Sequence, residues 1–290
     1  MDQIKNHPLY RKHDLDSVMS SMWDFYKKNF ISLFIISIVI SLITQFASTF
    51  IDIKELQSIT DPILMIEKMK EFMVPAIITV LISLFLNTVL QHYIIFHPVG
   101  ESGILNSLVA ALRYYLPFLV IMILFAFVGA IGLVLGVLAL IIGAFFVVLY
   151  LIMLYLFILP ILMIEGPDIG RTISRTFTLA HRNFWANMGW VAIFLIIMIV
   201  ISVVLSSIIM IPFAGNFLKT IFSPGSVEAI DVTKNPVFII LASLSGAITL
   251  PLMPILSCIM YFNAKAGEDE FSDQKPVEYR PTIEDLYSKP

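Results

Sequence analysis

The sequence predicts an all-α membrane protein with six transmembrane helices in three pseudo-repeats, each preceded by a cytoplasmic interfacial amphipathic helix. Three observations predict this class. The stretch from Tyr114 to Ile164 contains 51 residues and no charged side chain. The chain is 59% hydrophobic and 13% charged, against about 25% charged residues in a typical soluble domain. Its apolar residues form runs of about 20, the length of a membrane-spanning helix.

The uncharged stretch is too long for one span. As a single helix it would measure ~76 Å, about twice what a ~30 Å hydrocarbon core requires, so it must hold two spans. A turn is expected near Gly132–Gly136. In order, the six predicted spans are Phe30–Ile51, Met73–Phe96, Tyr114–Leu133, Val137–Ile164, Ala186–Ile211 and Pro236–Phe262. Because a charged head precedes the first run and no small-x-small pattern follows it, we expect an uncleaved anchor.

The distribution of Lys and Arg predicts the orientation, because cytoplasmic segments carry an excess of these residues. Thirteen fall in the head, the second and fourth connections and the tail, and five fall in the other connections. We therefore expect both termini to be cytoplasmic, in a multi-pass protein of the bacterial cytoplasmic (inner) membrane.

A threefold internal repeat accounts for most of the chain. The segment Trp23–Phe30 (WDFYKKNF) aligns with Phe177–Phe184 (FTLAHRNF) at an offset of 154, and Val109–Leu116 (VAALRYYL) is a weaker third copy. Each copy precedes a span and ends a short amphipathic stretch that is too polar to cross the membrane. Asp14 or Asp16 and Asp168 are the expected N-caps of the first and third stretches.

The repeat sets the predicted organisation. Residues 1–13 form a cytoplasmic N-terminal head, and 263–290 an acidic, disordered cytoplasmic tail. Between them, repeat unit 1 covers 14–98, unit 2 covers 99–164 and unit 3 covers 165–262, each with an amphipathic helix and two spans.

A polar stripe lies in the second predicted span. Ser83, Asn87 and Gln91 recur every four residues on one helical face, with His92 beside them. Polar groups in hydrocarbon are costly unless paired, so the stripe must face protein or water. Two interpretations stay open: a polar cavity that binds a headgroup or a solute, and interhelical hydrogen bonds that hold the bundle together.

A basic face forms the second candidate site. Arg171, Arg175 and Arg182 share one side of the third amphipathic stretch. Basic residues near an anionic leaflet are worth ~1 kcal/mol each, so this face is a candidate contact for anionic phospholipid. The alternative is that these arginines only keep their connection on the cytoplasmic side.

Helix breakers interrupt the last span. Pro251 and Pro254 fall near its middle. A broken helix can present backbone carbonyls to a transported ion, or it can be a kink whose free carbonyls are satisfied by neighbours.

The inventory of catalytic motifs is nearly empty. The sequence has no Walker loop, HExxH, GxSxG or dinucleotide fingerprint. Cys258 is the only cysteine, which excludes an internal disulfide. We therefore expect no enzyme activity, no cofactor, no metal and no nucleic-acid partner.

The segment LPILMIEGPDIGRTISRTFTLAHRNFWANMGWVAIFLIIMIV resembles the six-span membrane region of glycerophosphoryl diester phosphodiesterase membrane-domain proteins and YciC-like integral membrane proteins. The shared pattern is Pro160 at a span end, Glu165, and a basic amphipathic helix that leads through aromatic residues into the next span. In that family the hydrolase is a separate soluble domain, and this chain has none. The resemblance implies the fold and a connection to lipid, but no hydrolase activity.

These observations predict a non-enzymatic membrane protein that is lipid-associated or a scaffold, with membrane lipids and a protein partner or a second copy as expected partners. The alternative is a small-solute transporter or channel with a polar pathway near the second span.

Overall fold

The structure, a computed structural model, describes residues 2–50, 61–100, 103–215 and 235–273. Within these ranges the secondary structure is helical and includes no strand. The α-helices are α1 (Leu15–Lys28), α2 (Phe30–Ser48), α4 (Pro62–Phe96), α5 (Ile104–Leu138), α6 (Leu140–Ile164), α7 (Ile169–Arg182), α8 (Phe184–Met210), α10 (Pro236–Thr249) and α11 (Leu252–Asp273). Three 3₁₀ turns, η1 (Asp2–Asn6), η2 (His97–Val99) and η3 (Ile211–Phe213), complete them.

Six helical segments in the described ranges are long and apolar enough to cross a membrane. They are α2, α4, α5, α6, α8 and the pair α10–α11 taken together. The prediction of an all-helical, multi-pass membrane protein is confirmed at this level.

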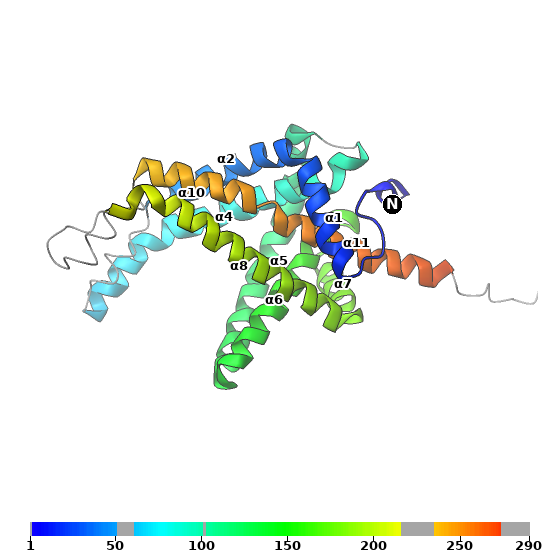
Figure 1. The fold of residues 1–290 in the computed structure, drawn as a ribbon. Helices are drawn as coiled ribbons and strands as arrows, with labels where there is room; N and C mark the ends of the chain where they lie inside the picture. Colours follow the sequence, from blue (N-terminus) through cyan, green and yellow to red (C-terminus); the bar gives the residue numbers. More distant parts are fainter. Residues whose placement is uncertain (1, 51–60, 101–102, 216–234, 274–290) are drawn as a thin grey trace, which may run out of the picture.

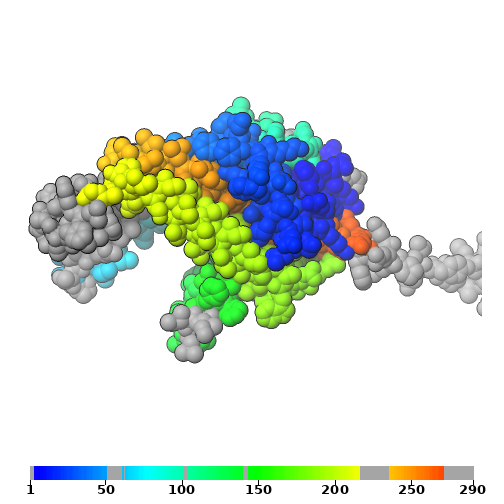
Figure 2. Space-filling model, viewed as in Figure 1, coloured from blue at the N-terminus to red at the C-terminus, as the bar shows by residue number. Residues whose placement is uncertain are grey.

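The helices spread from a shared base (Figure 1). We use "the base" for η1, α1, α7, α11 and the ends of α4 and α6 that pack against them. From it, α2 and α10 run side by side in one arm with α8 beside α10, and the α5–α6 hairpin forms another. In Figure 2 the N-terminal segment and α1, in blue, cover the base next to the orange-red end of α11.

The core is centred on the base and continues part of the way along the arms, through Leu33 and Ile40 of α2 and Phe118 of α5. Tyr261 and Phe262 of α11, Phe157 and Ile161 of α6 and Ile94 of α4 are all fully buried at the base. Many other large apolar side chains on the arms are exposed, as expected of surfaces that face hydrocarbon.

Two of the predicted helix starts are present. Asp14 begins α1 with a capping box, in which its carboxylate accepts from the Ser17 N–H and the Ser17 hydroxyl accepts from the Asp14 N–H. Asp168 begins α7, where its carboxylate accepts from the Arg171 N–H. Both satisfy N–H groups that have no partner within the helix.

The second unit differs from its prediction. Its short amphipathic stretch is not a separate helix, because α5 continues from Ile104 to Leu138 through Pro117. The turn to α6 lies at Ala139, a few residues beyond the expected Gly132–Gly136. Gly136 and Gly143 meet across this turn at a distance that leaves no room for a side chain.

The tail also differs. Residues 263–273 continue α11 as a helix instead of forming a disordered segment, and residues 274–290 lie outside the described part. Ala264, Lys265 and Glu268 are good helix formers, and the helix continues through Gly267 beyond the end of the apolar run. This extension carries the acidic side chains of the site described next.

Candidate functional site: the charged base of the bundle

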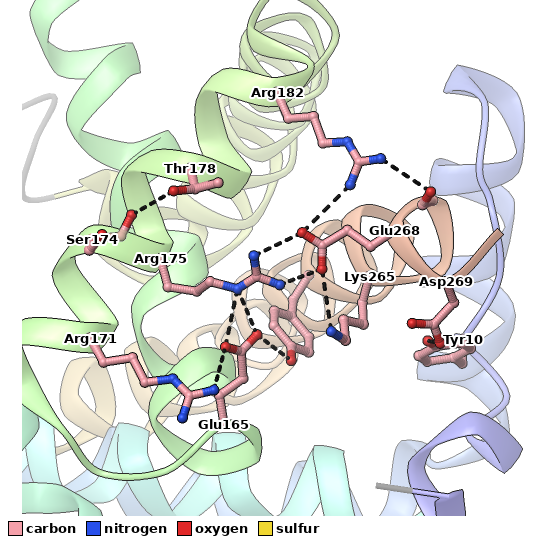
Figure 3. A network of polar contacts seen from close by, with 12 residues as sticks. Tyr10, Glu165, Arg171, Ser174, Arg175, Thr178, Arg182, Lys265, Glu268 and Asp269 are labelled. Atoms are coloured by element: carbon pink, nitrogen blue, oxygen red, sulfur yellow. Dashed lines mark hydrogen bonds and ion pairs between the residues drawn. The ribbon is translucent and has the colours of Figure 1, made fainter. Parts of the chain in front are cut away.

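Arg175 of α7 lies between two carboxylates at the base (Figure 3). Its Nε donates to both oxygens of Glu165, at 3.0 and 3.1 Å. Its two terminal nitrogens donate to the two oxygens of Glu268, one of them at 2.8 Å. Bidentate pairs of this kind are the strongest and most directional ion pairs in proteins. Arg175 therefore joins the end of α6 to the extension of α11.

The ion pair between Arg175 and Glu165 matters for stability because the Glu165 side chain is buried. The Glu165 side chain is 3% exposed, and the Tyr261 hydroxyl donates to it at 3.1 Å. The hydrogen bonds to Glu268 are the largest cause of a raised pKa at Arg175, so its guanidinium stays charged. A buried carboxylate needs such a partner, because an unpaired charge in this place would be costly.

Arg171 and Arg182 are held less firmly. Arg171 is 61% exposed, and its nearest carboxylate contact is 3.7 Å from Glu165. Arg182 lies 3.6 Å from Glu268 and donates to the carbonyl of Gly267 at 3.2 Å. Each of these arginines shares a carboxylate that Arg175 already engages. The predicted basic face thus divides into one internal arginine and two that reach the surface.

The N-terminal head is tied to the same helix extension. The Tyr10 hydroxyl donates to Asp269 at 2.7 Å, and Lys5 pairs with Asp269 at 2.9 Å. Lys12 pairs with Glu270. Three acidic residues of α11, which are Glu268, Asp269 and Glu270, therefore receive cations from α7 and from the head.

His7 anchors the head to the core. Its Nε2 donates to the Ile94 carbonyl at 3.1 Å, and its Nδ1 accepts from the Leu9 N–H at 3.1 Å. Burial lowers the pKa of His7 to about 4. Because one ring nitrogen donates a hydrogen bond and the other accepts one, the imidazole is held in its neutral form.

The polar stripe of α4 points to other helices. Asn87 donates to the Tyr155 hydroxyl of α6 at 3.1 Å, and Gln91 donates to the Cys258 Sγ of α11 at 3.1 Å. His92 lies 3.2 Å from the Ser107 hydroxyl of α5, and Ser83 lies 3.5 Å from that of Thr44 on α2. The space beside Asn87 and Gln91 is about 10 Å³, enough for about one water molecule. These contacts favour the interpretation as interhelical hydrogen bonds.

Side chains of neighbouring helices also donate hydrogen bonds to backbone carbonyls at and after the break between α10 and α11. The Tyr26 hydroxyl of α1 donates to the Ile248 carbonyl at 2.9 Å, and Gln91 reaches the Pro254 carbonyl at 3.4 Å. The Ile248 carbonyl lies at the interruption, so the Tyr26 hydroxyl satisfies a carbonyl that has lost its partner within the helix, whereas the Pro254 carbonyl lies inside α11. This favours the interpretation as a kink over an ion site.

The contacts described at the base are ion pairs and hydrogen bonds. In the ranges that the structure describes, no group of three His, Cys, Asp or Glu residues is arranged to hold a metal ion. The paired side chains are arranged to hold helices together and to leave cations at the surface.

Sequence reasoning identified the three arginines but missed Glu268, Tyr261 and Tyr155. The composition of the tail predicts disorder. Composition does not show that Lys265, Glu268 and Asp269 recur at helical spacing. Tyr155 lies in the uncharged stretch, where one hydroxyl among apolar residues gives little signal.

The comparisons with known proteins add no relative. No family model, curated protein or solved structure matches the chain. The resemblance to the membrane-domain family therefore stays a prediction.

Proposed function

We propose that this chain is a non-enzymatic integral membrane protein of the bacterial cytoplasmic membrane that associates with anionic phospholipid through the base. The observation that carries the proposal is the state of Arg171 and Arg182. Both are partly exposed, and both have only long contacts to carboxylates already engaged by Arg175. Their positive charge is thus left for a partner outside the chain.

The charge of the whole network supports the same proposal. Its ion pairs join six cations, Lys5, Lys12, Arg171, Arg175, Arg182 and Lys265, to four carboxylates, Glu165, Glu268, Asp269 and Glu270. These described residues therefore carry a net charge of +2, because six cations face four carboxylates. A basic surface next to an anionic leaflet gains about 1 kcal/mol per cation.

The proposed architecture is three units around a pseudo-threefold axis, with α1, the start of α5 and α7 at the membrane interface. The helix contacts support it. The second spans α4, α6 and α11 each contact the other two. Each first span also contacts the second span of the preceding unit in a cyclic order: α2 with α10, α5 with α4, and α8 with α6. Likewise α1 contacts α11, and α7 contacts α6.

Native mass spectrometry of gently solubilised protein, with identification of the lipids that stay bound, tests the function. We expect the wild-type protein to retain anionic phospholipid and an Arg171→Gln/Arg182→Gln variant to lose it. A Lys27→Gln/Lys28→Gln variant removes the same two charges from α1 and should keep the lipid. Equal retention by the arginine variant, or retention of zwitterionic lipid alone, would refute the proposal.

A further inference from the structure

A cavity of about 380 Å³ lies at the base, beside the arginine network. It is bounded by Lys12 and His13 of the head, by Arg182 and Asn183 at the end of α7, by Trp190 of α8, and by Asn263 and Glu270 of α11. Its volume is in the range of small-molecule sites. The polar stripe, by contrast, encloses almost no space.

Hydrogen-bond donors dominate the lining. The Asn263 Oδ1 accepts from the His13 N–H at 2.8 Å, which leaves the amide N–H groups of Asn263 as donors. Within the described part of the chain, the side-chain amide of Asn183 and the indole N–H of Trp190 have no hydrogen-bond partner. Trp190 is 6% exposed, and its indole ring lines the cavity wall, where its N–H is accessible to a ligand.

The charge of the lining is positive. Lys12 and Arg182 contribute two positive charges, and Glu270 contributes one negative charge while it pairs with Lys12. Burial lowers the pKa of His13, which disfavours the charged form of its imidazole. Its Nε2 contacts the Leu9 carbonyl at 3.2 Å, and its Nδ1 has no partner among the described residues. A lining with a net charge of +1 and several donors is complementary to a singly charged oxyanion.

We propose that this cavity binds a phosphate ester, with its oxygens accepting from Lys12, Arg182, Asn183 and Asn263 and with Trp190 against the rest of the group. A phosphodiester carries one negative charge and many acceptor oxygens, which matches the lining. The ester can come from a phospholipid headgroup or from a soluble phosphoester. The headgroup source rests on the proposed function, whereas the cavity itself does not.

Trp190 provides the readout. A Trp23→Phe/Trp185→Phe variant leaves Trp190 as the only one of the three tryptophans, and both replaced side chains are exposed. Its fluorescence in detergent is titrated with short-chain phosphatidylglycerol, short-chain phosphatidylcholine, glycerol 3-phosphate and inorganic phosphate. We expect a saturable change with phosphatidylglycerol. A saturable change with the soluble phosphates instead would support the cavity and assign it to a soluble ester.

The variant Asn263→Asp tests the site itself. It keeps an oxygen to accept the His13 N–H but replaces the amide donors with a negative charge, so we expect at least a tenfold loss of affinity. The matched control is Asn235→Asp, the same change at the N-cap of α10 away from the cavity. A thermal melt of each variant checks folding.

The outcomes separate the two proposals. An unchanged affinity in Asn263→Asp, or no saturable response to any phosphate compound, would overturn the cavity assignment whatever lipid the protein retains. Equal binding of phosphatidylcholine and phosphatidylglycerol, lost in Asn263→Asp, would support the cavity and contradict the anionic-lipid function.

Discussion

Arg175 is the side chain on which the base depends most. It is the only described residue that contacts both Glu165 and Glu268 through paired hydrogen bonds, and those two carboxylates lie 103 positions apart in the chain. Removing one partner of a buried ion pair is costly because the remaining charge stays buried. The damage should therefore come from the Glu165 carboxylate left behind, more than from the arginine that is lost.

Arg175→Gln is accordingly expected to destabilise the protein by about 3 kcal/mol and to lower its apparent melting temperature in detergent clearly. Arg171→Gln is the matched control. Arg171 is mostly exposed, and exposed pairs contribute about 0–1 kcal/mol. If both variants melt at the same temperature as the wild type, the ion-pair network does not hold the base together.

The lowered pKa of His7 makes the stability of the folded protein depend on pH. Its pKa is lowered from 6.5 to about 4 in the folded protein, so the unfolded state binds a proton more readily. Stability from this group is complete above pH 6.5 and is lost as the pH falls towards 4, by at most about 3 kcal/mol.

The measurement is the melting temperature of wild-type protein and His7→Gln between pH 7.5 and 5. The wild type should lose stability across this window, and His7→Gln should start lower but change less. Parallel curves for the two proteins would show that His7 is not the titrating group.

At the scale of elements, the α5–α6 hairpin relies on two glycines. A Cβ on Gly143 would lie 2.6 Å from the Gly136 carbonyl oxygen, and a Cβ on Gly136 would lie 2.9 Å from the Ala144 Cα. Both atoms belong to the backbone and cannot move aside as a side chain would. Small residues at helix contacts in membranes allow this kind of close approach.

Gly143→Ala should therefore destabilise the hairpin, although alanine is the better helix former by about 1 kcal/mol. Gly189→Ala in α8 is the control, since a Cβ there meets nothing within 4 Å and should be neutral or stabilising. A melting temperature for Gly143→Ala at or above that of Gly189→Ala would contradict the close approach.

Most of the helices could be predicted from the sequence. Apolar runs of about 20 residues give the six spans, and Asp14 and Asp168 give two helix starts, because both signals are local. The sequence does not predict the continuity of α5, because the charge of Arg113 and the repeat match at Val109–Leu116 favour a separate amphipathic stretch before the third span. Pro117 lies about three and a half turns inside α5, where neighbouring helices can satisfy the carbonyl that it frees.

The candidate site was less predictable because its partners are far apart in sequence. The basic face of Arg171, Arg175 and Arg182 is a local pattern, but Arg175 and Glu268 are 93 residues apart. Only the packing of α11 against α6 and α7 brings them together. The sequence indicated where the cations lie, and the fold determined which of them remain available to a ligand.

At the scale of the whole molecule, the base gathers the head, α7 and the end of α11 on one side of the bundle. The start of α4, which includes Lys68 and Lys70, lies away from the base (Figure 1). The lipid proposal requires the base to lie at the cytoplasmic leaflet, as the distribution of Lys and Arg predicts.

Labelling of introduced cysteines by a membrane-impermeant maleimide tests this placement most directly. The natural Cys258 is fully buried and provides the unlabelled background. Ser20→Cys on α1 reports the base, and Lys70→Cys on α4 reports the far end; both positions are exposed. In intact spheroplasts we predict labelling of Lys70→Cys alone, with Ser20→Cys labelled only after the membrane is permeabilised. Labelling of Ser20→Cys in intact spheroplasts, with Lys70→Cys protected, would contradict the account.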